Sequence, residues 1–137
     1  MSRMHGWAVV VALVLGGCAQ EEGGHHDHDH AHGEGAASGA NCPSGSTLTY
    51  ETFGRGFMAQ YCTRCHSSSL QGAQRQGAPS DHNFDSLAAL KAVGAEHVDT
   101  AAAAGPSAVN TVMPPQDPRP SEAERRQLGE WLACGMP

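Results

Sequence analysis

Apolar and polar positions divide the chain into three parts. An unbroken apolar run covers residues 7–15, and residues 20–40 contain no large apolar side chain. From residue 42 onward, apolar residues recur three and four positions apart, which is the spacing of amphipathic helices. The pattern predicts an apolar leader, a polar connecting segment and one domain of the all-α class, with about four helices and little strand.

The first and last helices of this domain have the clearest signals. One is predicted from about Thr49 into Cys62, because its apolar residues follow helical spacing. The last helix is predicted to begin at Ser121, an N-cap residue with Glu124 three positions on, and these two residues form a capping box. Its apolar stripe consists of Leu128, Trp131 and Leu132.

Two shorter helices are predicted between them. Residues 84–93 have helical spacing, with Asp85 or Ser86 as the cap. Gly94 interrupts the pattern, and an alanine-rich helix is expected over residues 95–104. A glycine and a proline follow directly, and both residue types end helices.

The apolar leader resembles a bacterial export signal that ends in a lipid attachment site. Residues 7–15 are too few to span a bilayer but suit the core of a signal peptide. They lead into Leu15-Gly16-Gly17-Cys18, which resembles a lipobox. The resemblance implies a lipoprotein signal peptide over residues 1–17 and a lipid on Cys18, which anchors the protein to one of the cell-envelope membranes, facing the periplasm. The alternative is an ordinary cleaved signal with an incidental cysteine.

Residues 18–41 are predicted to form a disordered tether, because they bury too little apolar surface to offset their ordering entropy. The tether contains histidines interleaved with carboxylates, which are potential ligands for zinc, copper or nickel. These histidines are His25, His26, His28, His30 and His32. A flexible spacer is the favoured interpretation, with weak binding of divalent metals as an accompanying property.

The acidic charge is concentrated in this tether. The 137-residue chain has a formal net charge of −6. Residues 18–41 contain five acidic residues and no Lys or Arg, whereas residues 42–137 contain nine acidic and seven basic residues. Because nucleic acids bind basic surfaces, this distribution excludes a nucleic-acid function.

Two cysteines and a histidine form the most informative motif. Cys62 and Cys65 lie three positions apart and His66 follows directly, which is the spacing of a c-type haem attachment site. On a helical turn both sulfurs face one side, so both can bond the vinyl groups of one haem while His66 ligates the iron. The alternatives are a chance match, a thioredoxin-like redox pair and half of a zinc site.

This motif resembles that of the class I cytochromes c, and the resemblance extends over residues 42–137. It implies a small all-α fold packed around one covalent haem c. Gly54, eight residues before Cys62, matches a family glycine that lets the last helix approach closely. Trp131 resembles the aromatic residue that packs there. Met58 stands where the family usually has an aromatic residue, and it is expected in the core.

A methionine beside prolines matches the distal ligand of the family. Met113 precedes Pro114 and Pro115 and stands just before the last helix. The resemblance implies that His66 and Met113 are the two axial ligands of the iron, and a thioether ligand raises the reduction potential. A core methionine is the alternative.

The resemblance also implies supporting residues around the haem. Pro79 belongs to a Gly-x-Pro loop whose proline carbonyl accepts a hydrogen bond from the proximal imidazole, so it is expected to orient His66. Arg75 is a candidate partner of a haem propionate, with a solvated surface arginine as the alternative. Less favoured alternative iron ligands are His82 and His97.

The two remaining cysteines, Cys42 and Cys134, lie at opposite ends of the domain. Disulfides persist in the oxidising cell envelope. Because the first and last helices of the family pack across each other, the resemblance predicts a Cys42–Cys134 disulfide. Two free thiols are the alternative.

The expected function is therefore electron transfer rather than enzymatic catalysis. The resemblance implies an Fe(II)/Fe(III) couple with both ligands kept in place, redox proteins as partners, and a monomer or a subunit of a larger redox complex. A near-neutral domain predicts that partner association depends weakly on salt. The alternatives are a haem sensor with a labile sixth ligand, a metal-handling lipoprotein that uses the tether, and, least favoured, a thioredoxin-like reductase.

Overall fold

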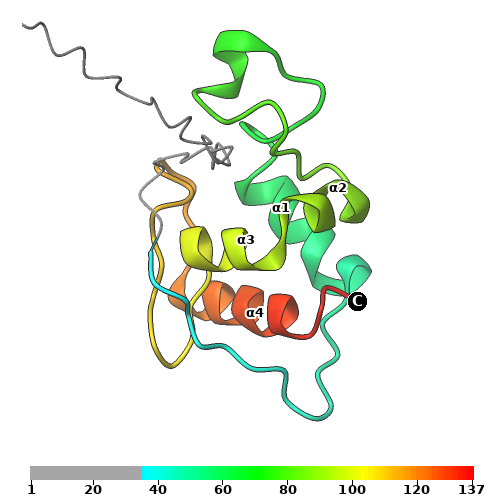
Figure 1. Cartoon of the computed structure of the whole chain (residues 1–137), viewed down its shortest axis with the longest axis vertical. Helices are drawn as coiled ribbons and strands as arrows, with labels where there is room; N and C mark the ends of the chain where they lie inside the picture. Colours follow the sequence, from blue (N-terminus) through cyan, green and yellow to red (C-terminus); the bar gives the residue numbers. More distant parts are fainter. Residues whose placement is uncertain (1–34) are drawn as a thin grey trace, which may run out of the picture. The chain divides into compact units, whose positions relative to one another are not determined.

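A computed structural model of the chain describes residues 35–137, and this part is all-α, with four α-helices and no strand (Figure 1). The elements in chain order are the π-helical turn η1 (Tyr50–Gly54), α1 (Arg55–Tyr61), the 3-10 turn η2 (Gly72–Arg75), α2 (Leu87–Val93), α3 (Ala95–Ala102) and α4 (Glu122–Ala133). Within the described range, every helix is too short or too polar to cross a membrane.

The first helical segment runs from the Thr49 cap to Cys62, as predicted, but its first turn is π-helical. The hydroxyl of Thr49 accepts a hydrogen bond from the backbone N–H of Thr52, and the backbone N–H of Thr49 donates to the Thr52 hydroxyl. These reciprocal bonds pair backbone groups that a helix start leaves unpaired. The segment then continues through α1 without a break.

The caps of the later helices also agree with the sequence. Ser86 caps α2, and Ser121 with Glu124 forms the capping box of α4. Helix α3 ends at Ala102, two residues earlier than predicted, because Ala103 is extended and the N–H of Ala104 donates to a carbonyl of α4. The chain thus leaves α3 to pack along α4, and these two helices lie side by side (Figure 1).

The helical segment at residues 50–61 crosses α4 at a glycine. A Cβ atom on Gly54 would lie only 2.4 Å from Cζ2 of Trp131. Trp131 is fully buried, and the ring of Phe53 meets its ring edge-on. The predicted close approach at Gly54 is therefore confirmed, and Met58 is buried in the core as expected.

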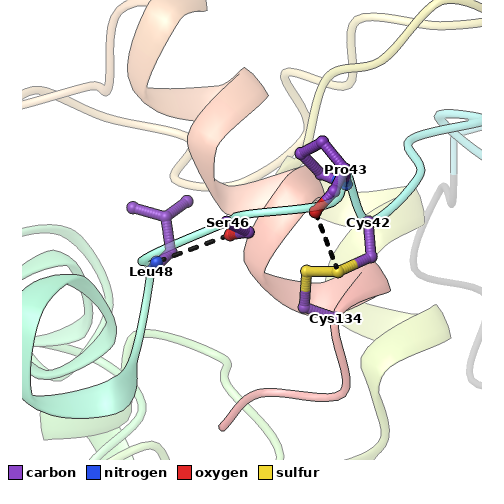
Figure 2. Close-up of a disulfide and its surroundings, with 5 residues drawn as sticks. All are labelled: Cys42, Pro43, Ser46, Leu48 and Cys134. Carbon is purple, nitrogen blue, oxygen red and sulfur yellow. Dashed lines mark hydrogen bonds between the residues drawn. A yellow bond between two sulfur atoms is a disulfide. The ribbon is translucent and has the colours of Figure 1, made fainter.

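Cys42 and Cys134 form the predicted disulfide, with their Cα atoms 4.8 Å apart (Figure 2). The chain turns directly after Cys42, where the N–H of Ser46 donates to the carbonyl of Pro43. The N–H of Leu48 then donates to the Ser46 hydroxyl (Figure 2). The bridge joins the residue that follows α4 to the segment that enters the first helix.

Residues 35–41 form an N-terminal strap on the domain, so the predicted tether over residues 18–41 extends too far. Ser38 is fully buried, and its N–H and hydroxyl both donate to the Asp99 carboxylate of α3. A Cβ atom on Gly105 would lie 2.4 Å from the Ser38 carbonyl oxygen. Small residues and hydrogen bonds, rather than apolar burial, order this strap.

Several predictions concern residues outside the described range. They are the signal peptide over residues 1–17, the lipid on Cys18, and the metal-binding histidines His25, His26, His28, His30 and His32. These remain predictions from the sequence.

Candidate functional site

One cavity of about 380 Å³ brings together the principal residues that the sequence singles out. Its wall includes both motif cysteines, His66 and Met113, although Met113 lies far along the chain. The rest of the wall is largely apolar, with side chains such as Phe84, Val98 and Leu128. Cavities that bind small molecules and cofactors commonly have a volume of about 300–1,000 Å³ and apolar walls with few polar groups.

The end of α1 delivers the cysteine–histidine motif to this cavity. The N–H of Cys62 donates to the carbonyl of Met58 at 2.9 Å, which continues the helical pattern. The N–H groups of Cys65 and His66 then donate to the carbonyl of Cys62 at 3.1 and 3.0 Å. Cys62, Cys65 and His66 of this tight turn all line the cavity.

Neither motif cysteine forms a disulfide, and the thiol of Cys62 has a raised pKa. Burial raises the pKa of Cys62 to about 12, so its sulfur is a neutral thiol at physiological pH. Redox pairs and zinc sites need a thiolate, which is favoured by a lowered pKa. The environment of Cys62 therefore opposes thioredoxin-like chemistry.

The ring of His66 is held on two sides. Its Nδ1 lies 3.2 Å from the carbonyl oxygen of His82, and the Phe84 ring stacks on it at 4.7 Å between centroids. Burial lowers the pKa of His66, which favours the neutral imidazole. In the tautomer that donates from Nδ1 to this carbonyl, Nε2 retains a lone pair for a metal.

The carbonyl that orients His66 belongs to His82, not to Pro79 as predicted. The Pro79 carbonyl accepts a hydrogen bond from Nη2 of Arg75 instead. A turn in which the N–H of His82 donates to the Pro79 carbonyl brings the later carbonyl to the imidazole. The expected kind of contact is present, and its acceptor lies three residues further along the chain.

Arg75 organises the loop after the motif and also lines the cavity, and its contact with a propionate stays a prediction. It is 5% exposed, so it is not the solvated surface arginine of the alternative. Its guanidinium donates to five protein acceptors, which matches its five N–H groups. The acceptors are the carbonyls of Ser67, Ala78, Pro79 and His82 and the side-chain oxygen of Asn83.

Met113 is held in place through its main chain. Its N–H donates to the carbonyl of Ala101 in α3 at 2.9 Å, and its carbonyl accepts from Nη1 of Arg125 in α4 at 2.8 Å. The Met113 side chain is partly buried against the core and lines the cavity. His82 and His97 also line it, with ring centroids 4.6 Å apart.

Sequence reasoning did not identify Arg125. The buried guanidinium has Nη1 bonds to the carbonyls of Ala102, Asn110 and Met113. A signal was available, because Arg125 stands three and seven residues before two apolar residues of the α4 stripe, Leu128 and Leu132. A basic residue on the apolar face of a helix requires buried acceptors.

The residues around the cavity include the kinds of group that could hold a covalently bound haem. It has two unpaired thiols, a neutral imidazole, a thioether and apolar walls. Across residues 35–137, no three His, Cys, Asp or Glu side chains are grouped so that they could hold a metal ion by themselves. No family model, curated protein or solved structure matches the chain, and its function is inferred from these residues.

Proposed function

We propose that the protein is a monohaem cytochrome c that transfers electrons in the bacterial cell envelope. The observation that supports this most is the shared cavity of Cys62, Cys65, His66 and Met113. These are the four residues that the resemblance to class I cytochromes c implies as attachment sites and axial ligands of the haem. Cys62 and Cys65 would hold the haem through thioether bonds, and His66 and Met113 would supply its axial ligands.

The haem, when bound, supplies a reversible one-electron Fe(II)/Fe(III) couple. The chain binds and orients it. The His82 carbonyl and the Phe84 ring fix the direction of the His66 imidazole. Main-chain hydrogen bonds to α3 and α4 fix the backbone of Met113. Ligands on a fixed backbone keep their positions when the charge changes, which suits outer-sphere electron transfer.

The proposed location depends on the N-terminal part of the chain. A lipid on Cys18 would attach the protein to a membrane, and the polar segment that follows would separate the haem domain from that membrane. The partners would be redox proteins that approach the domain. Mass spectrometry of the mature protein tests the anchor, and an unmodified N-terminus away from Cys18 would contradict it.

The decisive experiment is a visible spectrum of the exported protein, produced with haem maturation factors and recorded oxidised and reduced. We expect a covalent c-type spectrum and a weak far-red band of methionine-to-iron charge transfer in the ferric form. Met113→Leu should abolish this band, whereas Met58→Leu should retain it, because Met58 belongs to the core of α1. Replacement of both Cys62 and Cys65 by serine should abolish covalent attachment.

Other outcomes favour other functions. A high-spin spectrum, or one that shifts readily with carbon monoxide, would replace the electron carrier by a haem sensor with a labile sixth position. Absence of haem would refute the proposal and favour the metal-handling lipoprotein. Zinc titration then decides that alternative, because it requires tight binding that is lost on deletion of residues 25–32.

A further inference from the structure

The segment around Met113 has few hydrogen-bond donors of its own. We call residues 110–118 the Met113 loop. It contains Pro114, Pro115 and Pro118, which have no backbone N–H. Carbonyl groups in such a loop cannot all be paired by the loop itself, so they need donors from elsewhere. In this fold, arginine side chains supply these donors.

Arg125 holds the first half of the Met113 loop. It is 2% exposed, and its Nη1 lies 2.8 Å from the carbonyl oxygens of both Asn110 and Met113. The same nitrogen donates to Ala102 of α3 at 2.7 Å. Hydrogen bonds from a buried cation are stronger than neutral ones, and removal of the cation leaves its acceptors unpaired. Arg125 therefore links the loop to α3 and α4 together.

Arg64 holds the second half of the loop. This residue stands between the two motif cysteines, and its guanidinium donates to the carbonyls of Gln116 and Asp117. The haem-attachment motif is thus tied directly to the loop that contains Met113. Together, Arg64 and Arg125 bind the loop on both sides of the adjacent prolines Pro114 and Pro115.

Asn110 fixes the point where the loop begins. Its side-chain amide donates to the carbonyls of Ala36 and Asp99, both at 2.8 Å. Its own N–H donates to the carbonyl of Ala103. The loop therefore starts from a position set by the N-terminal strap and α3. Beyond it, Arg125 and Arg64 bind four of its carbonyls from outside the loop, and Arg119, just after the loop, donates to the Pro115 carbonyl.

We propose that Arg125 and Arg64 are positioning residues that set how strongly Met113 occupies the sixth coordination position of the iron. This inference rests on the proposed function. A thioether is a weak ligand, so its occupancy depends on how often the loop presents it. A loop released from its arginines samples other conformations, and the fraction of molecules with Met113 in place falls accordingly. The position then becomes accessible to external ligands.

The test is a titration of the ferric protein with imidazole, followed by loss of the far-red methionine band. In Arg125→Leu and Arg64→Ala, we expect the apparent affinity for imidazole to rise about tenfold or more, since a hydrogen bond to a charged group is worth that much. Arg125→Lys keeps the positive charge on a side chain that is one atom shorter. Its imidazole affinity should therefore lie between those of wild type and Arg125→Leu. Haem content should not change.

Two control variants distinguish a specific effect on the Met113 loop from general destabilisation of the fold. Arg126→Ala removes the neighbouring arginine of α4, which is exposed and paired with Glu122, and should leave imidazole affinity unchanged. Gly54→Ala destabilises the fold at the contact with Trp131, outside the Met113 loop, and should also leave the imidazole affinity unchanged. If Arg64→Ala and the Arg125 variants all bind imidazole with the same affinity as the wild-type protein, the proposal is overturned. If Arg125→Leu does not fold, Arg125→Lys and Arg64→Ala decide.

A second measurement keeps this proposal distinct from the proposed function. If the wild-type chain binds no haem, the cytochrome proposal and the role at the iron both fail. Hydrogen exchange at the amides of residues 110–113 then tests whether the arginines hold the loop. Faster exchange in Arg125→Lys but not in Arg126→Ala supports the holding contact, and equal exchange in the two variants refutes it.

Discussion

A single added methyl group at Gly54 should destabilise the domain, although alanine favours helices more than glycine does. The backbone of Gly54 is right-handed helical, so alanine fits there without backbone strain. The added Cβ atom would lie 2.4 Å from Cζ2 and 2.5 Å from Cη2 of Trp131. The Trp131 ring is fully buried and packs against Tyr50 and Phe53, so it cannot withdraw easily.

Gly56, in the first turn of α1 and two residues after Gly54, offers a matched control in the same continuous helical segment. It is exposed, and a Cβ atom there would meet nothing within 4 Å. Gly56→Ala should therefore raise the free energy of unfolding by about 0.5–1 kcal/mol, the gain expected for alanine over glycine in a helix. Gly54→Ala has the same gain but adds an overpacking cost of about 1–3 kcal/mol. The difference between the two variants measures that cost.

Urea denaturation followed by circular dichroism measures both free energies on the mature protein. In thermal melts, Gly54→Ala should melt below Gly56→Ala by about 4–8 °C for each kcal/mol of difference. Trp131→Phe removes the two ring atoms that the methyl group would meet, so it should relieve much of the Gly54→Ala penalty in the double variant. Equal stabilities of Gly54→Ala and Gly56→Ala would refute the close crossing.

Three further predictions concern the disulfide, the carboxylate of Glu124 and the buried guanidinium of Arg75. Replacement of Cys42 and Cys134 by serine opens a loop with a sequence separation of 92 and should cost about 4.6 kcal/mol by chain entropy, measured by urea denaturation. Hydrogen bonds from Ser121 lower the pKa of Glu124 below its ordinary 4.5, so the folded state favours the carboxylate. This stabilisation is complete above pH 4.5 and is lost as the pH falls through the lowered pKa. Wild type should therefore exceed Glu124→Gln in stability at neutral pH, and the gap should close in acid; a gap that does not change with pH would contradict this. Arg75→Leu leaves several buried carbonyls unpaired and should speed hydrogen exchange across residues 67–83, whereas unchanged exchange there would show that Arg75 does not order the loop.

Local signals in the sequence predicted the helices well, because each relied on nearby residues. The capping box at Ser121 and the cap at Ser86 depend on contacts within a single turn. The crossing at Gly54 also agreed, but this prediction came from the resemblance to the class I cytochromes c. Spacing alone does not say which aromatic residue a glycine will meet.

The predictions that failed concerned hydrogen bonds made by irregular segments of the chain. Composition predicted disorder for Ser38, because small polar residues bury little apolar surface. The strap is instead ordered by a carboxylate, Asp99, located 61 residues further along the chain. The five acceptors of Arg75 lie within eight residues of it, whereas the three carbonyls bound by Arg125 lie 12 to 23 residues away. Both sets depend on the course of irregular backbone, which hydrophobic periodicity does not encode.

The disulfide also determines how the domain responds to mechanical force. If a lipid holds the N-terminus, any pull between membrane and partner enters the domain through the N-terminal strap. Beyond Cys42 the force divides, since the covalent bridge passes part of it directly to Cys134. Tension can peel residues 35–41 away from Asp99, but further extension is limited by a closed covalent loop that contains both the motif turn and Met113. Under such tension the segment with the cysteine–histidine motif and Met113 would extend only as a closed loop.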